Sequence, residues 1–266
     1  MDGTRPSGEP AAFDPPPGGI LVLSHRVEPT EAAGGTRLSL TALCELFQKA
    51  AASHATALGV GGEVLREQGL AWVLLQWSLE MAAWPAAGDG LLLETWPSAY
   101  SDRIVRRDFF VLSKDHRRLG RATSHWAMLD LARRRPVRMP DPVRAIPTPA
   151  RDGALDAPLL KLPAPDPPES VMAILVGKEH LDENGHVNNV RYVEWIEASL
   201  SGTDVPGECL ARLDVSFRAE ARAGESISVE RGAEAGAAPG AAFRHRIRAS
   251  AGERELAVAR TVFQLR

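Results

Sequence analysis

Cysteine is scarce in this sequence, and long hydrophobic runs are missing. The 266 residues include only two cysteines, Cys44 and Cys209, so at most one disulfide could form and nothing indicates an oxidising compartment. No run approaches the roughly 18 apolar residues of a membrane span. The first residues lack both the apolar core of a signal peptide and the Arg- and Ser-rich pattern of a transit peptide. We therefore expect a cytoplasmic protein with two buried thiols and no stable membrane insertion.

Net charge is also small, at -3, but it is unevenly distributed. Ser101 through Met139 holds eleven Lys and Arg against four Asp and Glu, a local excess of +7 that leaves -10 for the rest of the chain. Such an excess can attract an acidic partner, although basic residues on solvated strand faces are the commoner explanation. No helix-turn-helix or basic reading segment precedes either half of the chain, so no nucleic-acid partner is expected.

Two stretches rich in proline, glycine and small residues divide the chain. We expect residues 1–18 to form a disordered tail and residues 140–170 to form a linker. Between and after them lie two folded blocks, residues 19–139 and 171–266. The hydrophobic share of 44% is enough for one large domain or two small ones.

Each block places one helix before several strand-like segments. Apolar residues at helical spacing predict one helix over residues 40–59, ended by a glycine, and another from about Asn189 to Ser199. The strand-like segment from Leu70 aligns without a gap with the segment from Leu210, which places Glu80 opposite Glu220. This repetition predicts an α+β protein with two curved antiparallel sheets, each wrapped around its own helix.

Polar side chains suited to catalysis lie just before the second helix, in the segment HLDENGHVNNVRYVEWIEASL that leads into it. It places Asp182, Asn184 and His186 at alternate positions, which point to one side of an extended chain, so we expect them to converge on one substrate carbonyl. The helix that follows offers unpaired N–H groups suited to an oxyanion. Gly185 permits a tight turn there. Taken locally, the same residues also fit a purely structural turn followed by a helix N-cap.

LDENGHVNNVRYVEWI resembles the catalytic segment of the acyl-acyl carrier protein thioesterases of plants and bacteria, whose pattern is D-x-N-x-H-V-N-N-x-x-Y. GDGLLLETWP, RRDFFVL and SHWAMLDLARRRPVRMP are similar to further motifs of that family, in the expected order. The resemblance extends from about Ile20 to Arg266. It implies a double hotdog fold in which the N-terminal half accommodates the fatty acyl chain and the C-terminal half is catalytic.

The resemblance also marks individual residues. Those that correspond to the catalytic residues of the family are Asp182, Asn184, His186 and Glu220. Ala221 stands where the plant enzymes have a cysteine, so a cysteine nucleophile is not expected at that position. Cys209 lies too far along the chain to replace it.

Thioester hydrolysis suits these residue types. The thiol leaving group has a pKa of about 8.5, so it needs little help from a general acid. We expect Asp182 and Glu220 to activate water jointly, or one of them to act as a covalent nucleophile, while Asn184 and His186 orient groups and donate hydrogen bonds. No cofactor is expected. A metal site built on His180, Asp182 and His186 lacks further ligand spacing.

The function that the resemblance implies is hydrolysis of fatty acyl-acyl carrier protein, which releases free fatty acid and ends chain elongation. The acidic carrier protein is expected to dock on the basic surface within residues 101–139, and charge reversal of Arg106 and Arg107 is the first test of that docking. Two alternatives stay open, a hotdog thioesterase that acts on acyl-CoA and a non-catalytic acyl-binding protein. A homodimer is also left open.

Overall fold

The computed structural model describes residues 19–182, 185–201, 203, 210–238, 240–251 and 254–264. The expected tail at residues 1–18 lies outside the described residues, as does Cys209. The helices are α1 (Leu40–Ala57), α2 (Gly62–Glu67), α3 (Asp141–Arg144) and α4 (Asn189–Ser199), with short 3-10 turns η2 (Pro29–Glu31) and η3 (Lys178–His180). None of these helices is long and apolar enough to span a bilayer.

Eleven strands form one large sheet. They are β1 (Leu21–Arg26), β4 (Leu70–Met81), β5 (Gly90–Tyr100), β6 (Ile104–Ser113), β7 (Arg118–Asp130), β8 (Arg135–Val137), β9 (Ser170–Leu175), β10 (Leu210–Phe217), β11 (Ser226–Ala233), β12 (Ala242–Ala249) and β13 (Glu255–Phe263). The short strands β2 (Ala32–Ala33) and β3 (Arg37–Leu38) pair separately.

The strand order shows the two repeats. It runs β1-β5-β6-β7-β4 in the first repeat and then β10-β13-β12-β11-β9 in the second, with β8 beside β7, so the two halves mirror each other. The central strands β4 and β10 pair antiparallel, for example Leu79 with Leu213. The expected α+β class with two hotdog repeats is confirmed. The two curved sheets are continuous, because β4 and β10 join the repeats edge to edge.

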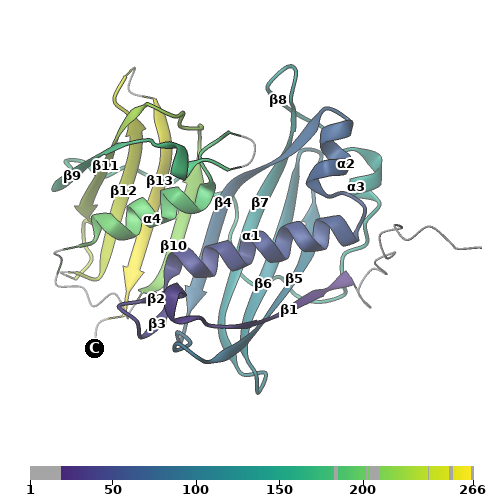
Figure 1. Cartoon of the computed structure of the whole chain (residues 1–266), viewed down its shortest axis with the longest axis horizontal. Coiled ribbons are helices and arrows are strands. Elements are labelled where there is room, and N and C mark those ends of the chain that lie inside the picture. Colours follow the sequence, from purple (N-terminus) through teal and green to yellow (C-terminus); the bar gives the residue numbers. More distant parts are fainter. Residues whose placement is uncertain are drawn as a thin grey trace, which may run out of the picture.

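Both long helices lie on one face of this sheet (Figure 1). α1 begins at the N-cap Ser39, whose hydroxyl accepts the Ala42 N–H at 3.1 Å, and ends before Gly59 in the left-handed region at φ +73. Its side chains Leu43 and Phe47 are buried against the sheet. α4 begins after the N-cap Asn188. Both helices predicted from the sequence are confirmed to within two residues at each end.

The strands that follow α1 and α4 also agree with the prediction, but β1 was missed. It is only six residues long and alternates between half-buried and exposed side chains, which is typical of an edge strand. The repeat itself held the signal, because the segment VMAILVG before α4 has the length and apolar, β-branched content of a short strand and forms β9. α2 and α3 are too short to give a periodic pattern.

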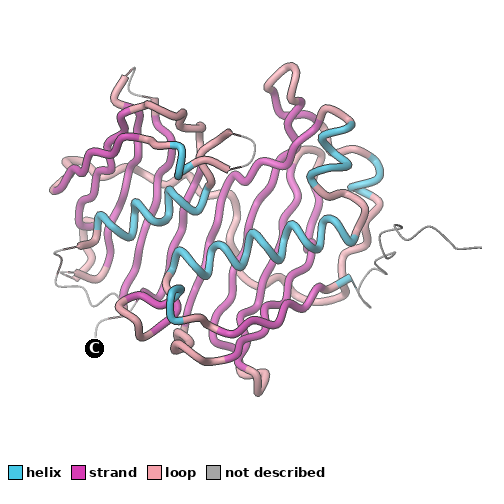
Figure 2. The backbone as a smooth tube through the Cα atoms, viewed as in Figure 1, coloured by secondary structure: helices cyan, strands magenta, loops and turns pink. Residues whose placement is uncertain are grey.

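Residues 145–169, expected as part of a linker, cross the sheet on the face opposite the helices. Phe109 of β6 packs on the α1 side, whereas its neighbour Asp108 accepts the Ala154 N–H of the linker at 3.0 Å. Ala154 joins a buried apolar cluster with Trp96 and Phe110. The tube in Figure 2 shows this long loop passing behind the strands of the first repeat. The linker is therefore part of the packed structure of that repeat.

Candidate active site

The turn between η3 and α4 holds two of the predicted catalytic residues, Asp182 and His186. Leu181 and Val187 form an isolated β-bridge that closes it. The Asp182 N–H donates to the His186 carbonyl at 2.7 Å, and the His186 N–H donates to Asp182 Oδ1 at 3.1 Å. The Gly185 N–H donates to the Asp182 carbonyl at 3.0 Å. Asp182 and His186 are thus tied to each other at the start of α4.

The segment is a turn and not an extended strand, so the expected alternation of side chains was wrong. Gly185 adopts φ +75, which reverses the chain between Asp182 and His186. Sequence reasoning recognised the glycine as a turn residue but did not apply that turn to its neighbours. Asn184, the third predicted residue of this group, lies outside the described residues.

Glu220, the fourth predicted catalytic residue, follows β10 and faces this turn. Its Oε2 lies 3.7 Å from His186 Nε2, and both side chains are 40% exposed. The same oxygen accepts a hydrogen bond from Arg134 Nη2 at 2.9 Å. His186, Glu220 and Arg134 therefore meet at one partly open place, although they come from distant parts of the chain.

Arg134 comes from the first repeat and was not predicted as a site residue. It lies in the turn between β7 and β8 and adopts φ 50, in the left-handed region. Figure 1 shows this hairpin and the start of α4 at the same ends of the strands. Strand pairing explains the proximity, because the end of β7 at Asp130 pairs with the start of β4 at Leu70, next to the end of β10.

Tyr192 fixes the backbone at Glu220 and was also missed. It lies on α4, is 2% exposed, and its hydroxyl oxygen accepts the Ala221 N–H at 2.8 Å. Burial raises the pKa of Tyr192 to about 12, so the phenol stays protonated. On the other side, Arg254 Nη2 donates to the Glu220 carbonyl at 3.1 Å. The sequence did contain a signal for this role, because Tyr192 is the tyrosine of the motif and falls on the same face of the helix as other buried residues.

The N-terminus of α4 offers fewer free donors than expected. The Val190 N–H donates to the Asn188 side chain at 3.0 Å, and the Arg191 N–H donates to the Asn188 carbonyl at 2.9 Å. The prediction of an N-cap in this segment is confirmed. The partial positive charge of the helix end still lies directly after His186.

His180 has a structural role at the base of the turn. Its Nδ1 accepts the Gly177 N–H at 3.0 Å, and its ring packs edge-on against Trp195 with 5.3 Å between centroids. Its carbonyl accepts the Asn188 N–H at 3.1 Å. Among the described residues, no group of three or more His, Cys, Asp and Glu side chains is placed to hold a metal ion.

The structure contradicts the choice of Arg106 and Arg107 as docking residues. Arg106 pairs with the buried Asp108 at 3.2 Å and donates to the linker carbonyl of Leu155. Arg107 is 7% exposed and its Nη1 lies 3.0 Å from Nδ1 of the buried His54. The two arginines lie on opposite faces of β6, where Arg107 is buried and Arg106 is half-buried. Adjacent strand residues alternate between faces, and here both faces of the sheet are covered.

Apart from Arg121, which pairs with Glu80 at 2.7 Å on β7, the other cations of residues 101–139 lie at two opposite ends of the sheet. Lys114, Arg117 and Arg118 belong to the hairpin between β6 and β7, far along the strands from Glu220. A second group lies at the same end as Glu220, in the turns before β6 and after β7. Its exposed members are Arg103, Arg133, Arg134, Arg135 and Arg138.

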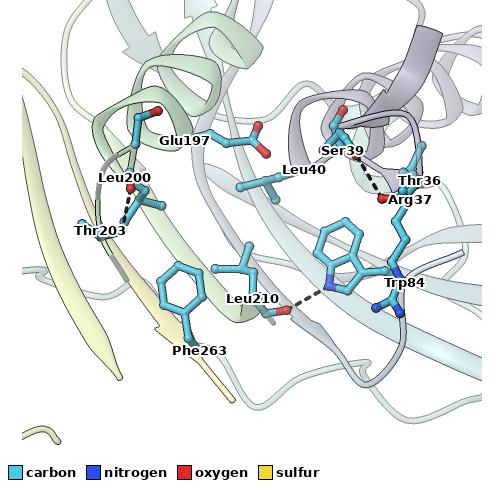
Figure 3. A pocket seen from close by; sticks show the side chains of 13 residues that line it. Thr36, Arg37, Ser39, Leu40, Trp84, Glu197, Leu200, Thr203, Leu210 and Phe263 are labelled. Carbon is cyan, nitrogen blue, oxygen red and sulfur yellow. Dashed lines mark hydrogen bonds between the residues drawn. The ribbon is translucent and has the colours of Figure 1, made fainter. Parts of the chain in front are cut away.

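A cavity of about 390 Å³ lies elsewhere, at the opposite end of α4. α4 separates Glu197 and Leu200 at the cavity from His186 at the site turn, and its 11 residues span about 16 Å. Figure 3 shows the cavity from close by, between the beginning of α1 and the end of α4. It does not reach the predicted catalytic residues.

Sequence comparison supplies the family. Residues 24–146 match the acyl-ACP thioesterase N-terminal domain and residues 169–265 match the acyl-ACP thioesterase C-terminal domain, where ACP is acyl carrier protein. The chain belongs to the acyl-ACP thioesterase family. A palmitoyl-acyl carrier protein thioesterase of Gossypium hirsutum is 31% identical over 195 residues, which are 68% of this chain and 47% of that protein.

Further members of the acyl-ACP thioesterase family are similar to this chain in sequence or structure. Oleoyl-acyl carrier protein thioesterase 1 of Arabidopsis thaliana is 27% identical over 76% of this chain and 59% of its own length. The chain thus spans about half the length of the curated relatives that it matches. Among solved structures, an acyl-ACP thioesterase from Bacteroides thetaiotaomicron superposes with a TM-score of 0.80 at 23% identity, covering 92% of this chain and 98% of that one. The double hotdog fold follows from these likenesses.

Proposed function

We propose that this chain hydrolyses the thioester of fatty acyl-ACP and releases a free fatty acid. The observation that carries the proposal is the meeting of His186 and Glu220 beside Asp182 at the N-terminus of α4. Membership of the acyl-ACP thioesterase family supports the substrate class. A cytoplasmic location is part of the proposal, whereas the plant relatives carry the description chloroplastic.

Glu220 is the proposed base. Arg134 holds its Oε2, whereas its Oε1 makes no hydrogen bond with another described residue and is left for a water molecule. In the first step Glu220 takes a proton from water while the water oxygen bonds to the thioester carbon. The carbon–sulfur bond then breaks, the electron pair leaves with sulfur, and the thiolate recovers the proton. Asp182 keeps the turn closed and orients His186 beside the reacting group.

Replacing Glu220 tests this assignment. Glu220→Gln keeps the size of the side chain and its contact with Arg134 but removes the basic oxygen, so we expect kcat to fall by about 10²- to 10⁴-fold with little change in KM. A single turnover in ¹⁸O-labelled water checks the alternative route. Label found only in the fatty acid supports direct attack by water, whereas label in a protein carboxylate would show that a carboxylate is the nucleophile.

Carrier-protein docking is proposed on the exposed arginines at the Glu220 end of the sheet. Arg103 and Arg135 make no ion pair with another described residue, so their charge is available to an acidic partner. Arg134 lies between this surface and the catalytic carboxylate. The arginines of the opposite hairpin, such as Arg117, lie too far along the strands to serve a carrier whose acyl chain must reach Glu220.

A further inference from the structure

The first repeat contains a structural counterpart of the site turn. β1, η2 and α1 follow one another as β9, η3 and α4 do, with the same number of residues between corresponding elements. The bridge between Leu181 and Val187 corresponds to the pairing of Ala32 with Leu38. The described part of the site turn thus has a counterpart in the first repeat.

Hydrogen bonds of this turn are repeated as well. Thr36 N–H donates to the Ala33 carbonyl at 3.3 Å as Gly185 N–H donates to the Asp182 carbonyl at 3.0 Å, and Ser39 N–H donates to the Glu31 carbonyl at 2.8 Å as Asn188 N–H donates to the His180 carbonyl at 3.1 Å. These shared bonds identify the corresponding residues, although the left-handed residues differ, being Gly185 in the site turn and Gly34 and Gly35 in its counterpart. The side chains can therefore be compared position by position.

The counterpart lacks the proposed hydrolytic groups but carries a cation. Ala33 stands where the site turn has Asp182, and Arg37 stands where it has His186. In the sequence, Gly35 corresponds to Asn184. A turn with alanine, glycine and arginine offers neither a general base nor a nucleophile, so no hydrolysis is expected there. A guanidinium can still bind an anion.

This counterpart turn forms one wall of the cavity of about 390 Å³, a volume typical of small-molecule sites. The apolar side chains that line the cavity are Leu38, Leu40, Trp84, Leu200, Leu210 and Phe263. In Figure 3, Arg37 and Trp84 stand on one side of the cavity, with Leu200 and Phe263 across from them. The cavity is a mainly apolar chamber with a cation on one wall.

Arg37 is available to a ligand, whereas the acid in the same cavity is engaged. The Arg37 side chain is half-buried and makes no hydrogen bond or ion pair with another described residue. Glu197 Oε2 accepts the Thr41 hydroxyl at 2.9 Å at the beginning of α1. Burial raises the pKa of Glu197, which weakens its repulsion of a second carboxylate. A ligand that suits this cavity has a carboxylate for Arg37 and an apolar body for the opposite wall.

We propose that the cavity is a second ligand site, which binds a free fatty acid without hydrolysing anything. The carboxylate pairs with Arg37, and the hydrocarbon chain lies against Trp84, Leu200 and Phe263. The choice of a fatty acid rests on the proposed function, because a fatty acid is the product of that reaction. The site is the non-hydrolytic counterpart of the active site, at the other junction between the two repeats.

Calorimetric titration of the full chain with decanoate tests the proposal. We expect two classes of bound decanoate, one at the active site and one in the cavity. Arg37→Gln should weaken the cavity class by about tenfold or more, the value of a charge-assisted hydrogen bond of about 1.5 kcal/mol. Leu200→Trp should abolish the cavity class by filling the space. Arg26→Gln, which changes an exposed arginine on edge strand β1, serves as the matched control.

Competitive inhibition by decanoate separates the two sites. The inhibition constant reports the active site, so it should be the same in wild type, Arg37→Gln and Leu200→Trp. Identical decanoate titrations for wild type and both cavity variants would overturn the proposal. A chain that binds decanoate through Arg37 but hydrolyses no acyl-ACP would support the cavity site and refute the proposed function. Hydrolysis of acyl-ACP with no effect of either variant on decanoate binding would support the proposed function and refute the cavity site.

Discussion

The outer faces of the two repeats differ, although the strand order is the same. In the first repeat the linker covers this face and buries Trp96, Phe110 and Leu112. In the second repeat charged side chains occupy the same face, and Glu230 pairs with Arg246 and Arg248 at 2.6 and 2.7 Å. The two repeats therefore share their backbone topology but not their outer-face side chains. Apolar side chains occur where the linker covers the strands, and ion pairs occur where charged residues form the surface.

Polar groups buried on the inner face of the sheet also differ between the two repeats. Each repeat buries a histidine near the C-terminal half of its long helix. His54 of α1 meets Arg107 of β6, whereas His245 of β12 lies 3.2 Å from the hydroxyl of Ser199 on α4 and 3.0 Å from that of Thr261. The two repeats thus bury different hydrogen-bonded groups beside their long helices. The repeats share a backbone architecture, but their side chains differ in the functional groups that they carry.

Giving the site turn the side chains of its counterpart tests whether the difference between the two turns lies in their side chains alone. The triple substitution Asp182→Ala, Asn184→Gly, His186→Arg gives the site turn the side chains of its counterpart at Ala33, Gly35 and Arg37. Because the two backbones share their hydrogen bonds, the fold should survive, and the initial rate of thiol release should fall by about 10³-fold or more.

Two readouts of the exchanged turn are needed. The thermal midpoint should stay within about 4 °C of wild type, a shift that corresponds to less than roughly 2 kcal/mol for a chain of this size. Loss of the rate together with an unchanged midpoint supports chemical roles for these residues. An exchanged turn that still hydrolyses acyl-ACP at the wild-type rate would contradict them.

Outer-face substitutions test the difference between a covered and an open face. Asp108 is fully buried under the linker, where it accepts hydrogen bonds from Thr123 and Ala154, so Asp108→Asn should lower the free energy of unfolding by about 3 kcal/mol. Arg260→Gln on the open face should cost about 1 kcal/mol at most, because Glu234 keeps its other partner, Arg244. Urea denaturation measures both. Equal costs would contradict the distinction between the faces.

The buried histidines predict a loss of stability in acid. Burial lowers the pKa of His54 to about 4 and that of His245 to about 3, from an ordinary value of 6.5. Below pH 6.5 the unfolded chain therefore binds protons that the folded chain rejects, so stability falls as the pH drops from 6.5 toward 4, by up to about 1.4 kcal/mol per pH unit for each histidine.

A histidine variant isolates this effect from the carboxylates that titrate in the same range. Glutamine at position 54 keeps a hydrogen-bond acceptor for Arg107 but does not titrate, so the free energy of unfolding of His54→Gln should fall less steeply between about pH 6.5 and about pH 5. Parallel slopes for wild type and His54→Gln would show that His54 takes up its proton in the folded chain as readily as in the unfolded chain.

Docking is expected to give the smallest effect. Arg135→Glu, near Glu220, should raise the KM for acyl-ACP several-fold and leave the KM for a small acyl-N-acetylcysteamine thioester unchanged. Arg117→Glu makes the same charge change in the hairpin at the other end of the sheet and is the matched control. Equal effects of the two variants would place docking elsewhere.

Much of the fold followed from the sequence, because periodicity and capping act locally. Both long helices and the strands after them were predicted from apolar spacing, and the repeat indicated the duplicated architecture. The joining of β4 to β10 depends on pairing between distant strands and left no local signal. The burial of Arg106 and Arg107 was missed for a related reason, since charge alone does not reveal that a linker and a helix cover the two faces of β6.

Part of the candidate site was also predictable. The family resemblance marked Asp182, His186 and Glu220, and the structure brings these three together, while Asn184 stays a prediction outside the described residues. Arg134 could not be predicted, because its contact with Glu220 crosses between the repeats. Tyr192 was visible as part of the motif, but its bond to the Ala221 N–H requires the position of α4 over β10.

The most direct test of the central claim is the initial rate of thiol release from acyl-ACPs of stepped chain length, with the matching acyl-CoAs measured beside them, for wild type and Glu220→Gln. We predict turnover that favours the carrier-bound series, depends on chain length and is lost in Glu220→Gln. Binding of the acyl-ACPs without any thiol release by the wild-type chain would contradict the claim and make this an acyl-binding protein.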